Sequence, residues 1–176
     1  MKLYVTRHGE TTWNVVDKIC GRTDAPLTDK GRAQAAALAE KAGDKGIEVI
    51  IASPLQRAYE TAMAVSEKIG VPVFKDERLM EQHYGVYEGM SRFDEGFLAD
   101  KRQFAAGYPG GESMFRLAHR IYGFLDDVKE RYPDQTVLLV CHNGVCRVIH
   151  SYFERMTNEE FAEFGVPNAC LLEYEL

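Results

Sequence analysis

The stretch LYVTRHGETTWN, residues 3–14, opens with a short apolar run and then places Arg7 and His8 directly before a glycine. Two more short runs rich in Val, Ile and Leu follow it, IEVIIA at 47–52 and TVLLVC at 136–141. Short runs with nearly continuous apolarity are typical of parallel strands that are covered on both faces. The sequence therefore predicts an α/β fold, a three-layer α/β/α domain with a mostly parallel central sheet.

Helical patterns alternate with these strands. Thr28 predicts the N-cap of a helix that stops at Gly43. Ser53 as N-cap, with Pro54 at the first helical position, predicts the start of a second helix that stops at Gly70. The positions of these caps and stops place one helix before the 47–52 strand and one directly after it.

A third helix is expected after Gly110 and Gly111, with Glu112 in its first turn and an end near Tyr132. Its predicted core stripe is Met114, Phe115, Leu117, Ile121, Phe124, Leu125 and Val128. The remaining expected elements are a first strand at 2–6, helices at about 144–153 and 158–163, and a last strand at 169–174.

The composition limits the class of protein. At 176 residues the chain is expected to form a single domain, residues 1–176. Its net charge of −6 argues against a nucleic-acid-binding surface, and no apolar stretch is long enough to cross a bilayer. The four cysteines form no C-x-x-C pair, which is typical of free thiols in a reducing compartment. We therefore expect a cytoplasmic protein without nucleic-acid or membrane partners.

Residues 84–108 depart from the alternation of strands and helices. They combine aromatic side chains, basic side chains and glycines without a sustained period. Two interpretations stay open: either the aromatics only fill the core beneath an irregular connection, or the segment forms a lid or substrate wall. Its aromatic residues are Tyr84, Tyr87, Phe93, Phe97, Phe104 and Tyr108, and its basic residues are Arg92, Lys101 and Arg102.

Polar side chains follow three predicted strands at their carboxyl ends. Arg7 and His8 follow the first strand, Arg57 lies early in the helix after the second, and His142 follows the third. Parallel sheets bind ligands in the crevice beyond these ends, and adjacent strands are only ~4.8 Å apart. Forked guanidinium groups and helix N-termini both favour phosphate or carboxylate. Each residue alone could be structural, but their common edge predicts an anion site.

Two other patterns compete with this interpretation. Residues 141–147, CHNGVCR, match the C-x-x-G-x-x-R arrangement of cysteine-dependent phosphatases only in part. Val140 and Val148 flank the match, where that family has His and Ser or Thr. Cys146 and His150 lie four positions apart on one expected helix, but no third and fourth metal ligands accompany them. We therefore expect neither a thiolate nucleophile nor a metal site.

Six motifs extend the pattern over nearly the whole chain. They are RHGET at 7–11 with Asn14, GRTDAPLT at 21–28, SPLQRAYETA at 53–62, EQHYGVYEG at 81–89, PGGES at 109–113 and CHNG at 141–144. By these motifs and their order, the sequence resembles the histidine phosphatase superfamily, which includes the cofactor-dependent phosphoglycerate mutases. The resemblance implies a phosphoglycerate mutase-like fold.

The resemblance also implies roles for the matching residues. His8 would be the nucleophile that forms a phosphohistidine, and Glu81 would donate a proton to the leaving group. Arg7, Arg57 and His142 would hold the transferring phosphoryl oxygens. The other residues expected to contact phosphate or substrate are Asn14, Arg22, Tyr84, Arg92, Asn143 and Gly144.

General chemistry agrees with these roles. A neutral imidazole, with an unperturbed pKa of ~6.5, suits attack on an anionic ester. Fixed cations stabilise the charge on the transferring phosphoryl group, and a protonated His142 would add a third to the two arginines. A positioned acid contributes ~10² to 10⁴ in rate. Glu81 is the expected acid, with Glu10 and Glu88 as less favoured donors.

The family divides by what accepts the phosphoryl group. The E-x-H-Y-G motif at 81–85, Arg92 and the basic pair Lys101-Arg102 favour a mutase, whereas the short chain and Tyr-Glu-Gly at 87–89 favour a phosphatase. We expect a metal-independent phosphomonoester hydrolase that acts on small phosphorylated metabolites without a cofactor; a homodimer stays open. The alternatives are a mutase with 2,3-bisphosphoglycerate as cofactor and a catalytically silent phospho-ligand binder on the same fold.

Overall fold

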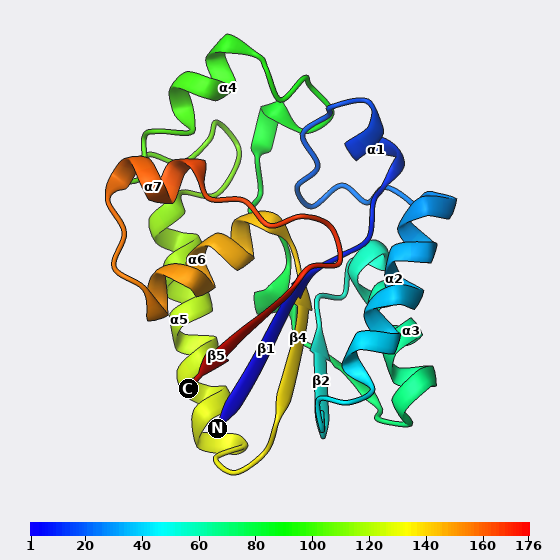
Figure 1. Cartoon of the computed structure of the whole chain (residues 1–176). Coiled ribbons are helices and arrows are strands. Elements are labelled where there is room, and N and C mark those ends of the chain that lie inside the picture. The colour runs from blue at the N-terminus through cyan, green and yellow to red at the C-terminus, as the bar shows by residue number, and fades with distance from the viewer.

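In the computed structural model, which describes residues 1–176, the apolar runs form one five-stranded sheet (Figure 1). Strands β1 to β4 run parallel to their neighbours, and β5 runs antiparallel to β1, so the predicted mostly parallel sheet is confirmed. The sheet order is β3-β2-β4-β1-β5. The strands are β1 Lys2–Arg7, β2 Val49–Ala52, β3 Val73–Lys75, β4 Val137–Cys141 and β5 Leu171–Glu175.

Helices cover both faces of the sheet, which confirms the three layers. The helices α5 (Met114–Arg131) and α6 (Asn143–Phe153) pack on one face, and α2 (Asp29–Ala42) and α3 (Gln56–Ile69) pack on the other (Figure 1). Every residue of β2 and β4 is buried. Successive side chains of a strand point to opposite faces, so these strands contribute to both cores and their sequences are apolar throughout.

The cap residues explain where the covering helices begin and end. Thr28 caps α2 by accepting a hydrogen bond from the Gly31 N–H, and Gly70 ends α3 in the left-handed conformation at φ 73°. The prediction that Ser53 caps α3 is wrong, because α3 begins at Gln56 after an N-cap position without a side-chain hydrogen bond. Ser53 instead continues the line of β2, and its N–H donates to the Val140 carbonyl.

Two details of the third predicted helix also differ. Helix α5 begins at Met114 with Ser113 as its N-cap, so Glu112 lies before the helix, where its carboxylate pairs with Arg120 at 2.8 Å. Phe115 is 63% exposed, whereas the other six residues of the predicted stripe are buried. Phe115 adjoins Met114 in sequence and therefore lies about 100° away from it around the helix axis, outside the buried face.

Smaller elements gather at the end where the parallel strands finish. Figure 1 shows α1 (Thr12–Val15), α4 (Glu95–Asp100) and α7 (Asn158–Glu163) at that end. The remaining elements are two short 3₁₀ helices between β3 and α4, η1 (Glu77–Leu79) and η2 (Gly85–Tyr87). None of the helices is both long and apolar enough to span a lipid bilayer.

The 84–108 segment contains the short elements η2 and α4, which its sequence pattern did not indicate, and it holds an aromatic cluster of its own. Phe97 and Tyr108 stack with ring centroids 5.7 Å apart, and Tyr84 and Tyr87 meet both rings edge-on. This cluster is separate from the two cores on the sheet faces. Phe93, by contrast, is 63% exposed. The segment therefore forms a small aromatic core of its own beyond the carboxyl ends of the strands, and its aromatic residues do more than fill the main core.

Candidate active site

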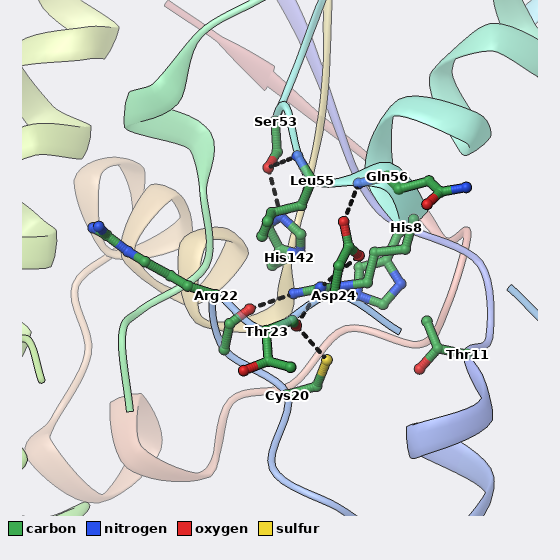
Figure 2. Close-up of polar contacts among 12 residues, drawn as sticks. His8, Thr11, Cys20, Arg22, Thr23, Asp24, Ser53, Leu55, Gln56 and His142 are labelled. Atoms are coloured by element: carbon green, nitrogen blue, oxygen red, sulfur yellow. Dashed lines mark hydrogen bonds and ion pairs between the residues drawn. The ribbon is translucent and has the colours of Figure 1, made fainter. Parts of the chain in front are cut away.

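Three adjacent strands deliver the polar side chains at the centre of the site. Arg7 and Cys141 are register partners in β1 and β4, so His8 and His142 follow at the same level, with ring centroids 5.1 Å apart. Ser53 follows the neighbouring strand β2, and its hydroxyl lies 2.8 Å from His142 Nε2 (Figure 2). The structure therefore brings the polar side chains together at the carboxyl ends of the parallel strands, as the sequence predicts.

His8 has a defined tautomer. Its Nδ1 lies 2.7 Å from the Gly9 carbonyl, which can only accept, so Nδ1 carries the proton and Nε2 carries the lone pair. Burial, and then the charges of Arg57 and Arg7, lower the pKa of His8 well below its ordinary value. The Asn168 amide also donates to the His8 carbonyl at 2.9 Å. His8 is therefore a neutral, oriented imidazole at pH 7.

Arg57 lies beneath His8 and has no exposed surface. Its Nε donates to His8 Nε2 at 3.3 Å, which requires that nitrogen to be unprotonated. Its Nη1 donates to the Thr23 carbonyl and to Asp24 Oδ1, both at 3.1 Å, and its Nη2 donates to the Gly21 carbonyl at 2.6 Å. Residues 21–24, which we call the Arg57 loop, therefore hold this guanidinium in place.

Glu88 anchors the Arg57 loop. Its carboxylate accepts from the Arg22 N–H at 3.0 Å, from the Thr23 N–H at 2.7 Å and from the Thr23 hydroxyl. Burial alone would raise the pKa of Glu88, but these hydrogen bonds outweigh it and lower the pKa below its ordinary value. Lys30 and Thr28 likewise lower the pKa of Glu10. The lowered pKa of both carboxyl groups disfavours them as proton donors at neutral pH.

Glu81 is placed by the start of α6. Its Oε2 accepts from the Gly144 N–H at 3.0 Å and its Oε1 from the Gln82 N–H at 2.9 Å, and the residue is only 4% exposed. A Cβ atom at Gly144 would lie 2.5 Å from Glu81 Oε1, so any larger residue at this position would displace the carboxylate. Gly144, predicted to bind phosphate, instead positions the carboxylate in this structure.

Arg7 and His142 each keep a buried nitrogen without a protein partner, Arg7 Nε and His142 Nδ1. Arg7 Nη1 donates to the Val166 carbonyl at 3.0 Å. Burial, and then the charges of Arg57 and His8, lower the pKa of His142 well below its ordinary value, which disfavours the protonated form that would supply a third positive charge. Such unpartnered buried groups need an explanation, and a polar ligand provides one.

A cavity of about 350 Å³ opens beside these groups. The sequence-predicted residues that line it are Arg7, His8, Asn14, Glu81, Tyr84, Arg92 and Asn143. Arg57, His142 and Gly144 are buried and do not line the cavity. Arg22 does not line it either, and Figure 2 shows its side chain extending away from His8 and His142. A second cavity, of about 420 Å³ beside α5 and β3, contains none of these residues.

The structure also adds residues that the sequence analysis did not assign to the site. Lys18, Lys101 and Arg147 line the cavity, and Asp24 and Asn168 position Arg57 and His8. Arg147 follows Asn143 by one helical turn on the same face of α6, a spacing that could have been noticed in the sequence. Asp24 and Asn168 act on residues far away in the chain, so no local pattern indicates their roles.

The cysteine pattern is structural. Cys141 and Cys146 are buried with their sulfur atoms 3.5 Å apart, and burial raises the pKa of the Cys141 thiol well above its ordinary value. A protonated, buried thiol is a poor nucleophile. His150 Nδ1 lies 2.9 Å from the Tyr174 hydroxyl, and no group of three or more His, Cys, Asp or Glu side chains is arranged to hold a metal ion.

Comparison with known proteins identifies the family. The sequence profile of the histidine phosphatase superfamily (branch 1) matches residues 3–176, and the chain belongs to this superfamily. Phosphoserine phosphatase 1 of Hydrogenobacter thermophilus is 32% identical over 96% of this chain and 83% of its own length. A probable phosphoglycerate mutase of Cronobacter sakazakii is 37% identical over 81% of this chain and 69% of its own length.

A solved structure agrees over nearly the whole chain. The vanadate complex of a mycobacterial glucosyl-3-phosphoglycerate phosphatase superposes with a TM-score of 0.88 at 30% identity, covering 98% of this chain and 90% of that protein. The phosphohistidine mechanism is general to the family. The chain is thus a phosphomonoester hydrolase of the histidine phosphatase type that acts on small organic phosphates, as the motifs predicted.

Proposed function

We propose that His8 accepts the phosphoryl group and that Glu81 is the proton donor. The observation that supports this assignment is a neutral buried imidazole, with its Nε2 lone pair free of a proton, that shares one cavity with a carboxylate. His8 Nε2 attacks phosphorus, the bond from phosphorus to the ester oxygen breaks, and the carboxylic acid form of Glu81 protonates that oxygen and becomes a carboxylate. Water then gives a proton to Glu81 and attacks the phosphohistidine, which releases phosphate and restores neutral His8.

The unpartnered donors would hold the phosphoryl oxygens. Arg7 Nε has no protein partner, and Arg7 is a cation at any physiological pH. If the Ser53 hydroxyl donates to His142 Nε2, then His142 Nδ1 carries a proton that a phosphoryl oxygen can accept. Arg57 contacts the same nitrogen of His8 that would carry the phosphoryl group, so its Nε is within reach of a phosphoryl oxygen once the bond forms.

The substrate side of the cavity comes largely from the 84–108 segment. Tyr84, Arg92, Phe97, Lys101 and Tyr108 all line the cavity, which supports the interpretation of this segment as a substrate wall. The cavity volume of about 350 Å³ suits a small phosphorylated metabolite. All four cysteines are free, including the adjacent buried pair, which supports a reducing compartment such as the cytoplasm.

Trapping of the phosphoenzyme tests this proposal. Incubation with a labelled aryl phosphate should give phosphoprotein that is acid-labile and base-stable, the behaviour of a phosphorus–nitrogen bond. His8→Ala should abolish both the label and phosphate release, whereas Cys141→Ser should keep both. Label that persists in His8→Ala would show that another residue accepts the phosphoryl group. Binding of phosphate without release from any ester would instead establish a silent binder.

A second assay separates hydrolysis from transfer between positions of one metabolite. We expect 3-phosphoglycerate to lose phosphate no more slowly than it isomerises, with or without 2,3-bisphosphoglycerate. Water must reach the phosphohistidine for hydrolysis, and a mutase must exclude it. Isomerisation that outpaces phosphate release, and that depends on the bisphosphate, would favour the mutase.

A further inference from the structure

The segment that carries Glu81 has no helix or strand of its own. Residues 80–84 lie between η1 and η2 in irregular structure, and Glu81 and Gln82 are both buried there. Buried backbone N–H and C=O groups need hydrogen-bond partners, and an irregular segment does not supply them through a regular ladder of its own. The partners from other parts of the chain therefore decide where Glu81 lies.

Arg120, on α5, binds this segment through its guanidinium group. Its Nη2 donates to the Glu81 carbonyl at 3.2 Å, and its Nη1 donates to the carbonyl of Arg78 in η1. The guanidinium thus fixes the main chain from which the Glu81 carboxylate extends towards the N–H of Gly144. A planar group with several donors can contact two carbonyls and a carboxylate at the same time, which a lysine ammonium does less well.

The carboxylate of Glu112 holds Arg120 in this position. Its Oε1 accepts from Arg120 Nε at 2.8 Å and its Oε2 from Arg120 Nη2 at 3.0 Å, and both side chains are largely buried. Such a bidentate pair fixes the plane of the guanidinium as well as its position. The pair also compensates the charge of Arg120 without the Glu81 carboxylate, whose oxygens accept from the N–H groups of Gln82 and Gly144.

The main chain of Glu112 binds the same segment. Its N–H donates to the His83 carbonyl at 2.8 Å, and its carbonyl accepts from the Gln82 side chain at 3.0 Å. Its carboxylate also accepts from the His83 N–H at 3.4 Å. Glu112 belongs to the PGGES motif at 109–113, so this motif contacts the segment that carries the proton donor.

We propose that Arg120 and Glu112 are positioning residues, which hold Glu81 where it can give its proton to the leaving oxygen. This inference rests on the proposed function, since it takes Glu81 as the proton donor. A buried ion pair adds little net stability, because the loss of hydration offsets the attraction between the charges. Neither Arg120 nor Glu112 lines the cavity, so both act on the reaction through the segment that carries Glu81.

Two leaving groups test the proposal. Glycerol 3-phosphate releases an alcohol that needs a proton, whereas 4-nitrophenyl phosphate releases a phenolate that leaves without one. Arg120→Lys keeps the charge but loses the planar set of donors, so we expect its kcat/KM to fall at least roughly 10-fold more for glycerol 3-phosphate than for 4-nitrophenyl phosphate. Glu112→Gln, which keeps the shape but removes the charge, should change the ratio of the two kcat/KM values in the same direction.

Two control variants separate position from stability, and each variant is checked for a retained unfolding transition. Arg116→Lys makes the same substitution one turn earlier on α5, at an exposed position, and should leave the ratio unchanged. Val128→Ala leaves a cavity in the core beneath the same helix, so it should lower the unfolding temperature without changing the ratio. An equal change of the ratio in Val128→Ala and in Arg120→Lys would attribute the effect to destabilisation and overturn the positioning role.

A double-mutant cycle assigns the effect to Glu81. Once Glu81→Gln has removed the proton donor, Arg120→Lys should change the ratio no further. If Arg120→Lys leaves the ratio unchanged while Glu81→Gln changes it, or if its effect persists in the Glu81→Gln background, the positioning role is overturned and the proposed function stands. A ratio that Glu81→Gln itself does not change overturns Glu81 as the proton donor, and with it this inference.

Discussion

The Nδ1–H of His8 is held by the carbonyl of the next residue, Gly9, so the backbone itself orients the imidazole. A carbonyl cannot take up the proton, and His8 therefore keeps its Nδ1–H while Nε2 reacts. Burial and two neighbouring guanidinium groups keep the ring neutral, which matters because only the neutral form has a free lone pair. The nucleophile is prepared by desolvation and orientation, without a carboxylate partner.

Gly144 gives a prediction at the same scale. In Gly144→Ala the new methyl group would displace Glu81 Oε1, since the two would be 2.5 Å apart. Release of alkyl alcohols, which need a proton, should slow roughly 100-fold, whereas release of 4-nitrophenolate, a good leaving group, should change little. The measurement is kcat for an alkyl phosphate and for 4-nitrophenyl phosphate.

The unfolding temperature of Gly144→Ala serves as its control. Alanine within a helix is more favourable than glycine by about 0.5–1 kcal/mol, so the variant should stay folded. Equal losses on both substrates would contradict the role of Glu81 as proton donor.

The functional role of a single residue can be predicted from the sequence when its side chain is of a type that rarely follows a buried strand. Arg7, His8 and His142 are charged or ionisable groups where a parallel sheet binds ligands, and the structure brings them together. Ser53 was mistaken for a helix cap, because serine before a proline suits that role equally well. Arg22 lies in a matching motif, yet its backbone N–H, and not its side chain, takes part in the site.

At the scale of elements, the Arg57 loop links two distant parts of the chain. Glu88, at the end of η2, binds the backbone of residues 22–23, and the loop in turn binds Arg57 through backbone carbonyls. The Glu88 carboxylate thus acts on His8 indirectly, through the Arg57 loop and then through Arg57. Glu88 is therefore a positioning residue, since it does not touch the nucleophile and does not itself line the cavity.

Removal of that carboxylate should loosen Arg57. We expect Glu88→Ala to lower kcat/KM for an aryl phosphate about 10- to 100-fold, because three hydrogen bonds to a charged group are lost from the loop. Amide hydrogen exchange of residues 21–24 should accelerate in parallel. Glu48→Ala is the control, since Glu48 also accepts a backbone N–H, that of Thr136, but far from the site. Unchanged kcat/KM with faster exchange would show that the loop does not position Arg57.

Elements were predictable where their patterns are long. Helices α2, α3, α5, α6 and α7 and the buried strands were expected, but α1, β3 and α4 were missed. These three elements have only four, three and six residues, and two of the three residues of β3 are exposed. The 84–108 segment has no period that a sequence analysis could use. Its aromatic cluster is defined by contacts between Tyr84, Phe97 and Tyr108. Tyr84 and Tyr108 lie at opposite ends of the segment in the sequence, so no local pattern indicates that they meet.

For the whole molecule, strand order decides which side chains meet, and the sequence does not contain it directly. The chain order of β1, β2 and β4 says nothing about their being neighbours, yet β4 lies between the other two. Handedness rules and the position of ligand sites in parallel sheets limited the choices. The shared edge of the polar residues was therefore predictable, whereas the antiparallel direction of β5 was not.

The two buried histidines make stability depend on pH. Their pKa values are lowered in the folded state, so below about pH 6.5 the unfolded chain binds protons that the folded chain does not. The free energy of unfolding should then fall as the pH falls below about 6.5, by up to ~1.4 kcal/mol per pH unit for each histidine. Urea unfolding between about pH 7.5 and about pH 5 measures this slope.

Variants identify the histidines responsible. His142→Asn should reduce the slope of the unfolding free energy against pH, while His119→Asn, at an exposed position of α5, should leave it unchanged. A wild-type slope near zero in this range, or one that His142→Asn does not alter, would contradict the account of the buried pair.

The pairing of Arg7 with Cys141 has a consequence for protein design. The distance between the two imidazoles is set by which residue of one strand lies opposite which residue of the next, a property of the main-chain ladder and not of any loop. A shift of the pairing by one residue would send one ring to the other face of the sheet. The histidine pair could therefore be transferred to any doubly wound scaffold that has two adjacent parallel strands in the same register. If the two histidines were placed on loops, their spacing would depend on the conformation of each loop.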